Sequence, residues 1–204
     1  MRKKITIAGA GLVGSLSALY LTQRGYDVTI YEKRKDLRSE IIRAGKSINL
    51  ALSKRGWTAL KKVNAHKEVE KIAIPMYRRI MHDMNGDLTE QQYGKKNEAI
   101  YSVSRAELNV IMMNLAERNG AKLYFNEKCL DIKFDGSSAI FENSNTKNIS
   151  EVRFDTIIGA DGTYSSIRDA MINKLNHEID IKYINHKYKE LLLPADSNGN
   201  HLLD

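Results

Sequence analysis

The stretch Gly9-Ala10-Gly11-Leu12-Val13-Gly14 comes directly after the apolar run Ile5–Ala8. A strand that ends in GxGxxG and continues into a helix is typical of a dinucleotide site. There, Gly9 permits the tight turn, Gly11 lets the backbone reach a pyrophosphate, and Gly14 lets the helix pack closely on the sheet. The start of the helix then offers free N–H groups and a partial positive charge to the phosphates.

An acidic residue ends the next apolar run. Glu32 follows Val28–Tyr31, at the distance from the glycines where a carboxylate accepts hydrogen bonds from a ribose diol. A 2′-phosphate would be repelled there, so we expect an unphosphorylated adenosine, as in FAD or NAD. The alternative is a glycine turn that serves packing alone, and it leaves Glu32 unexplained.

The bulk composition is that of an ordinary globular chain. It has 204 residues, 42% of them hydrophobic, and a net charge of +7. The basic residues are dispersed, and the short runs Lys33–Lys35 and Lys61–Lys62 are not interleaved with aromatic residues. We therefore expect a solvated surface that can attract anionic substrates, and no nucleic-acid partner.

Several classes of site are not expected. The single cysteine, Cys129, excludes an internal disulfide, and the five histidines fit no metal-site spacing. The N-terminus runs straight into the first strand with no secretory signal, and no apolar stretch approaches the ~20 residues that span a bilayer. We expect a cytoplasmic protein with no metal and no membrane segment.

Periodicity and turn signals predict an α/β fold. Asn85-Gly86 predicts a hairpin and hence a second, antiparallel sheet inserted into the nucleotide domain. Ser104 and Glu107 form a capping box. Helices are expected over 13–24, 53–63 (with Ser53 as N-cap), from 104 to Gly120, and from Thr163 or Ser165 to about 175. Strands are expected over 5–8, 28–32, 79–84, 122–125, 130–134, 139–142 and, buried, 154–159, with a charged surface segment at 33–47 and a polar loop at 144–150.

The turn Asp161-Gly162 is a second chemical signal, because ligands collect at the carboxyl edge of parallel strands. It follows the strand that ends at Gly159. Asp161 could bind a diol or orient a cation such as Arg168, and Gly162 would let the backbone approach a flat cofactor. The alternative is an Asp-Gly turn that caps the next helix.

These features together resemble the class A flavoprotein monooxygenases, also called aromatic hydroxylases. The shared pattern is the N-terminal GxGxxG with Glu32, an arginine at the start of a middle helix, Arg105, and the later Asp161-Gly162. The resemblance covers nearly the whole chain and is greatest to the members that hydroxylate L-kynurenine. It rests on the runs at 11–16, 45–53, 74–76, 101–105 and 161–165, of which Ser47-Ile48-Asn49-Leu50-Ala51-Leu52-Ser53 is the most specific.

The resemblance implies a Rossmann-like FAD-binding domain of the p-hydroxybenzoate hydroxylase type, with an inserted antiparallel portion of a substrate domain. Residues 1–70 and 101–175 would form the discontinuous FAD domain, and 71–100 with 176–204 part of the substrate-binding sheet. It also implies no protein metal and no catalytic side chain in this chain. The implied cofactor-binding residues are Gly9, Gly11, Leu12, Val13, Gly14, Glu32, Arg34, Ala51, Arg105, Cys129, Asp161 and Gly162.

Two residues are implied as substrate ligands. Arg79 would bind the kynurenine carboxylate, and Tyr93 would donate a hydrogen bond to the same group. A guanidinium fork and a phenol suit a carboxylate, and we expect the two to face each other across the Asn85-Gly86 turn. The alternative is two exposed strand residues on a solvated edge.

The implied activity is hydroxylation of L-kynurenine to 3-hydroxy-L-kynurenine with bound FAD, NADPH and O2. Family members are roughly twice this length, so we expect a fragment or truncated frame that breaks off at the start of the substrate sheet (191–204). Such a chain should bind FAD poorly and be inactive alone. The alternatives are a hydroxylase of another aromatic acid and a non-catalytic nucleotide-binding module.

Overall fold

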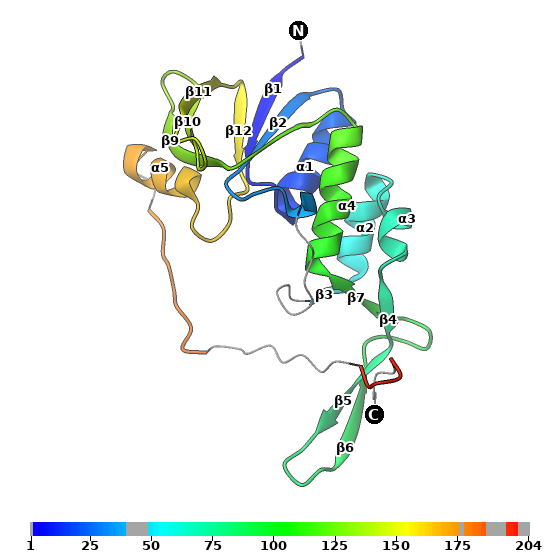
Figure 1. The fold of residues 1–204 in the computed structure, drawn as a ribbon. Helices are drawn as coiled ribbons and strands as arrows, with labels where there is room; N and C mark the ends of the chain where they lie inside the picture. The colour runs from blue at the N-terminus through cyan, green and yellow to red at the C-terminus, as the bar shows by residue number, and fades with distance from the viewer. Residues whose placement is uncertain (1, 40–48, 176–177, 187–194, 200–204) are drawn as a thin grey trace. The chain divides into compact units, whose positions relative to one another are not determined.

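The computed structural model describes residues 2–39, 49–175, 178–186 and 195–199 (Figure 1). It divides into two compact units, Met1–Ile42 with Ala106–Tyr183, and Arg43–Arg105 with Ile184–Asp204. Most of the expected charged segment at 33–47, and the expected sheet start at 191–194 and 200–204, lie outside the described residues. The functional domain boundaries stay a prediction.

A four-stranded parallel sheet forms the centre of the first unit, as the sequence predicts. Its strand order is β12-β1-β2-β8, with β1 (Lys4–Ala8) between β12 (Thr156–Gly159) and β2 (Asp27–Glu32), and β8 (Lys122–Phe125) beyond β2. Helix α1 (Leu12–Thr22) joins β1 to β2 and ends before Gly25, whose φ is 82°. All strands therefore present their carboxyl ends at the same edge, where ligands bind in such sheets.

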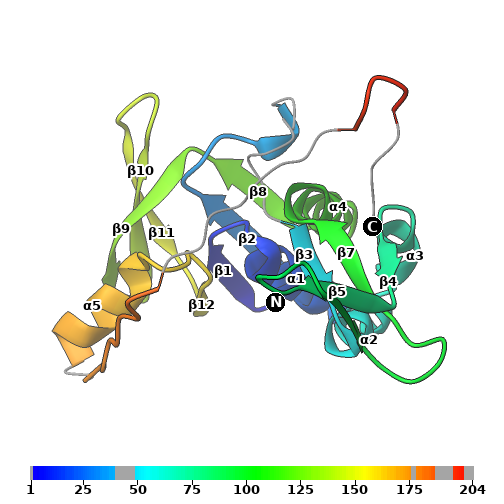
Figure 2. The ribbon, with the colours of Figure 1, turned by 90° about the horizontal axis from the view of Figure 1, so that it is seen from below.

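Side chains alternate between the two faces of this sheet. Ile7 and Ile30, fully buried, lie on the face of α1. Helix α4 (Arg105–Arg118) lies beside α1 in both ribbon views (Figures 1 and 2). On the opposite face Ala8 and Tyr31 belong to a second core cluster.

The second layer of the first unit is an antiparallel sheet with a helix. Strands β9 (Glu127–Lys133), β10 (Ser138–Asn143) and β11 (Ile149–Arg153) form the sheet, and α5 (Ser166–Leu175) packs against β9. Phe141 is fully buried, and its ring stacks on Tyr31 at 4.2 Å between centroids. Aromatic and aliphatic burial thus joins this layer to the parallel sheet.

The second unit has the antiparallel hairpin that the sequence predicts, and a three-stranded sheet that was not predicted. Its elements are β3 (Asn49–Leu52), α2 (Lys54–Lys62), α3 (His66–Glu70), β4 (Ile74–Met76), β5 (Arg78–His82), β6 (Leu88–Gln92) and β7 (Ile100–Ser104). The three-stranded sheet has the order β3-β7-β4, and β5 pairs with β6 in the hairpin around Asn85-Gly86. The rings of Trp57 and Tyr101 pack edge-on, with 5.1 Å between their centroids.

Two local predictions are wrong. The expected polar loop at 144–150 ends early, because Ile149 begins β11 and pairs with Glu142 across a tight turn that Asn143 holds with its side chain. The expected buried strand at 154–159 is β12, an edge strand whose residues are exposed or half-buried. Ile157 and Ile158, on opposite faces, are both only half-buried, because the strand has a neighbour on one side alone.

Gly14→Ala tests the contact between α1 and the sheet. A Cβ on Gly14 would lie 1.9 Å from the Gly9 carbonyl oxygen and 3.3 Å from Ile7 Cγ2, so the helix would have to move away. We expect a loss of about 1–3 kcal/mol or more in unfolding free energy, measured by urea denaturation. Gly11→Ala is the control, because no atom of the described residues lies within 4 Å of a Cβ placed there and φ is −69°; it should stay within about 0.5 kcal/mol of wild type. Equal losses in both variants would contradict this account.

Candidate nucleotide-binding site

The three glycines of the first turn have different surroundings. Gly9 has a φ of 101°, and a Cβ there would lie 2.4 Å from the carbonyl oxygen of Ala160. Gly14 touches the Gly9 carbonyl, whereas a Cβ on Gly11 would enter open space. Gly9 and Gly14 are therefore required for close packing, and Gly11 leaves the outer side of the turn accessible to a ligand.

The N-terminus of α1 is open to an external acceptor. Gly11 is its N-cap, and no side chain of the described residues caps the helix. The first N–H groups of a helix have no partner within the helix and carry a partial positive charge. Leu12 and Val13 supply two of them, and Val13 is 67% exposed. This arrangement suits a phosphate.

Both main-chain groups of Ala10, at the centre of the turn, are bonded to protein side chains. Its N–H donates to Glu32 Oε2 at 2.7 Å. Its carbonyl accepts from Ser15 Oγ and from Asn109 Nδ2, both at 3.1 Å. Residues from β2, α1 and α4 thus fix the orientation of the two consecutive peptide groups that flank Ala10, and with them the neighbouring N–H groups.

Glu32 is a buried and ionised carboxylate. Its Oε1 accepts from the backbone N–H of Arg34 at 3.0 Å and from Arg34 Nε at 2.8 Å. Burial by itself raises the pKa of Glu32, but the hydrogen bonds from Arg34 and Ala10 outweigh it and leave the pKa below its ordinary value. The acid therefore points toward the glycine turn and is charged at neutral pH.

A cavity of about 450 Å³ adjoins Glu32. Its size is within the range of small-molecule sites. Three consecutive basic residues on its wall favour a ligand that carries phosphate. Its lining comprises Ala10, Glu32, Lys33, Arg34, Lys35, Leu37, Asn109, Met113, Phe125, Asn126, Ser144 and Asn145.

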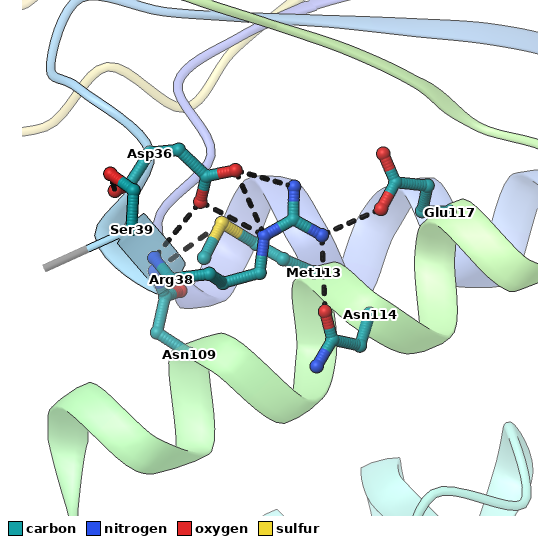
Figure 3. Close-up of polar contacts among 7 residues, drawn as sticks. All are labelled: Asp36, Arg38, Ser39, Asn109, Met113, Asn114 and Glu117. Carbon is teal, nitrogen blue, oxygen red and sulfur yellow. Dashed lines mark hydrogen bonds and ion pairs between the residues drawn. The ribbon is translucent and has the colours of Figure 1, made fainter.

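Arg38 connects the segment after β2, which forms one wall of this cavity, to α4 (Figure 3). Its guanidinium binds both Asp36 carboxylate oxygens and donates to Asn114 Oδ1 at 3.0 Å and to Glu117 Oε2 at 2.6 Å. It also lies over the Phe125 ring, 5.5 Å from the centroid. The hydrogen bonds from Arg38 lower the pKa of Asp36, although burial opposes them. The segment after β2 is thereby held in place beside the cavity.

Asp161 caps α5. Its Oδ1 accepts from Ser165 Oγ at 2.6 Å and its Oδ2 from the Ser166 N–H at 2.7 Å, while Ser165 Oγ accepts from the Arg168 N–H. The structure therefore shows the helix-cap interpretation of the Asp161-Gly162 turn, with Ser165 as the N-cap. Because the preceding residue, Ala160, touches Gly9, the two turns are neighbours. A contact of Asp161 or Gly162 with a cofactor stays a prediction.

Cys129 lies in the core cluster between the two layers and is 7% exposed. Burial, together with the nearby charges of Asp161 and Asp131, raises the pKa of its thiol to about 11. The thiol is therefore protonated at neutral pH and is no nucleophile. Any role at a cofactor falls to its backbone.

The other predicted site residues belong to the second unit. Ala51 lies in β3 opposite Ser102, and the exposed Arg105 begins α4. Arg79 and Tyr93 are both exposed on the β5–β6 hairpin.

Arg79 and Tyr93 are not directly opposite each other in the hairpin, so the expectation that they face each other is wrong. Arg79 pairs with Gln91, and the Tyr93 N–H donates to the Tyr77 carbonyl at 2.9 Å. Because side chains alternate along a strand, Arg79 and Tyr93 share one face of the hairpin as diagonal neighbours, a spacing that long side chains can still bridge.

Sequence reasoning missed two residues of the first unit, Asn109 and Arg38. Asn109 falls among the apolar positions of α4, where its only signal was a polar residue on a buried face. Arg38 was one of many charges in a surface segment. In the described part of the chain, no group of three or more metal-ligating side chains comes together, and no helix is both long and apolar enough to cross a membrane.

The fold and the site together define a dinucleotide-binding α/β domain. The chain matches the FAD binding domain family over residues 2–186 and belongs to that family. Its fold is that of the FAD-binding domain of class A aromatic hydroxylases. Among solved structures it is similar to the flavin-dependent monooxygenase PieE in complex with FAD and substrate (TM-score 0.72, 18% identity, 84% of this chain and 32% of that one). It is also similar to 2-methyl-3-hydroxypyridine-5-carboxylic acid oxygenase (TM-score 0.68, 22% identity, 84% and 42%).

The relatives found by sequence similarity carry a more specific name than the family. The chain is 41% identical over 201 residues to the kynurenine 3-monooxygenase of Flavobacterium johnsoniae, covering 98% of this chain and 45% of that protein. It is 42% identical over 191 residues to the kynurenine 3-monooxygenase of Legionella pneumophila, covering 93% and 42%. The chain thus spans less than half the length of these relatives.

The lowered pKa of Glu32 makes a prediction about acid stability. A carboxylate whose pKa is lower in the folded than in the unfolded state stabilises the fold above its unfolded pKa, and that contribution is lost as the pH falls through the folded pKa. We expect Glu32→Gln to lower stability at pH 7 and to make the decline from pH 6 to pH 3 shallower than in wild type. Urea denaturation across this range measures it, and parallel pH profiles for the two proteins would refute it.

Proposed function

We propose that this chain is the FAD-binding portion of an L-kynurenine 3-monooxygenase. The observation that carries the proposal is the open, accessible turn at Gly11 beside the ionised Glu32, in a chain 41% identical over 98% of its length to a protein of that name. The reaction consumes L-kynurenine, NADPH, a proton and O2, and releases 3-hydroxy-L-kynurenine, NADP⁺ and water.

The first unit offers groups that fit the adenosine and pyrophosphate of FAD. Leu12 and Val13 would present their N–H groups to the pyrophosphate, because Gly11 leaves that side of the turn open. Glu32 would accept hydrogen bonds from the ribose, and Arg34 would hold that carboxylate in place from the rim of the cavity. Bound FAD supplies the redox chemistry, through reduction by NADPH and reaction with O2.

The residues of the second unit would contribute binding and orientation. Arg105 and Ala51 would contact FAD, as in the family. Arg79 and Tyr93 would hold the kynurenine carboxylate on their shared face of the hairpin. The chemistry needs positioning and exclusion of water more than a general base, because the substrate amino group already activates the ring. The domain boundaries, the use of NADPH and a cytoplasmic location are part of the same proposal.

The 204-residue chain by itself should bind ADP, because the turn, Glu32 and the cavity all lie in its first unit. It should hold FAD weakly and show no NADPH oxidation that depends on L-kynurenine. Titration calorimetry with ADP tests the first point, and Gly11→Ala should weaken ADP binding at least about tenfold by obstructing the approach of the phosphates. Flavin absorbance that stays with the chain through gel filtration, together with L-kynurenine-dependent NADPH oxidation, would contradict the expected weak FAD binding and lack of activity.

Arg79→Ala tests the substrate site and is best made in the complete protein. Loss of a charge-assisted, bidentate hydrogen bond costs about 1.5–3 kcal/mol, so KM for L-kynurenine should rise roughly 10- to 150-fold with the FAD content unchanged. Arg78→Ala is the matched control, because Arg78 lies on the other face of the hairpin beside Glu90 at 3.5 Å. Unchanged kynurenine affinity in Arg79→Ala would refute this site, and stimulation by a different aromatic acid alone would favour a related hydroxylase.

A further inference from the structure

Asn109 carries a buried hydrogen-bond acceptor that has no partner among the described residues. Its side chain lies on α4, is 7% exposed and lines the cavity beside Glu32. Its Nδ2 donates to the Ala10 carbonyl at 3.1 Å, whereas no group in the described part of the chain donates to its Oδ1. Figure 3 shows Asn109 one helical turn before Met113, a second residue of the cavity wall. A buried acceptor without a donor is costly, so it indicates a group that is supplied from outside.

The orientation of this amide is determined by its neighbour. Exchanging the oxygen and nitrogen of Asn109 would place Oδ1 against the Ala10 carbonyl oxygen, so two acceptors would meet. Nδ2 therefore faces Ala10, and the free atom is the acceptor Oδ1. A ligand that satisfies it must present an N–H or O–H group.

Glu32 has little capacity left for a second hydroxyl. A carboxylate offers about four lone-pair sites. Three are occupied by the N–H groups of Ala10 and Arg34 and by Arg34 Nε. One site remains for a ribose hydroxyl, yet a ribose diol has two protons to donate.

We propose that Asn109 determines specificity at the adenosine site, where its Oδ1 accepts one ribose hydroxyl while Glu32 accepts the other. The inference rests on the nucleotide binding proposed above and adds the second acceptor for the diol. The ribose is favoured over the adenine amino group because Glu32 and Asn109 bind the N–H and the carbonyl of the same residue, Ala10, so both acceptors border the same part of the cavity.

Four nucleotides and two proteins test the proposal. ADP, 2′-deoxyADP, 3′-deoxyADP and inosine diphosphate are titrated into the wild-type chain and into Asn109→Leu by calorimetry. Wild type should bind each deoxy analogue about tenfold more weakly than ADP. In Asn109→Leu, one of the two deoxy analogues should bind as tightly as ADP. Inosine diphosphate, which lacks the amino group, should bind more weakly than ADP by the same factor in both proteins.

A purely structural role of Asn109 would give a different result. If its bond to Ala10 were its whole contribution, Asn109→Leu would weaken all four nucleotides by the same factor, and both deoxy penalties would persist; that outcome overturns the proposal. Loss of the inosine penalty alone also overturns it, because the donor would then be the adenine amino group. Absence of ADP binding to wild type would refute the nucleotide site itself.

The variants are designed to keep the turn intact. Ser15 Oγ still donates to the Ala10 carbonyl after Asn109 is replaced, and leucine has a similar volume. Asn109→Ala serves the same comparison if the leucine variant does not fold. Asn119→Leu is the matched control, because Asn119 is exposed just beyond the end of α4 and its side chain bonds only to the Leu115 carbonyl among the contacts of the described residues. It should retain both deoxy penalties.

Discussion

The first unit depends on how the main-chain groups of one buried residue, Ala10, are held. Its N–H donates to Glu32, and its carbonyl accepts from Ser15 and Asn109. These partners come from β2, α1 and α4, so Ala10 joins three elements at the end of β1. Because its N–H and its carbonyl are both bonded to protein groups, the backbone that leads into α1 is held by protein contacts alone. The contacts that stabilise the turn thus also orient the N–H groups at the start of α1.

Close packing of main chain on main chain supports this arrangement. Gly9 lies against Ala160, and Gly14 lies against Gly9, so the first turn, the start of α1 and the turn after β12 meet with no room for a side chain. Asp161 stabilises the last of these turns by capping α5. A ligand at the carboxyl edge of the sheet would therefore meet backbone held by packing rather than by flexible side chains.

Local signals in the sequence predicted most of the fold. The glycine spacing and the Asn85-Gly86 turn depend on backbone geometry within a few residues, and the structure agrees with both. It also places Glu32 at the end of β2. The missed features have different causes. Ile149 joins a sheet because β10 lies beside it, β12 is partly exposed because it is an edge strand, and the register of Tyr93 follows from the turn at Asp83–Asp87. Asn109 was missed because its partner Ala10 is 99 positions away, which no window of sequence reveals.

Because β1 pairs with β12, the central sheet can be completed only after most of the chain has been synthesised. The Lys4 N–H bonds the Asp155 carboxylate, 151 positions away, at 2.7 Å. At about 5–20 residues per second, the first strand emerges about 8–30 s before its outer neighbour exists. During that interval β1 can pair with β2 alone, and its other edge needs shielding from foreign strands. Nascent chains of this topology should therefore engage chaperones early and complete their central sheet late.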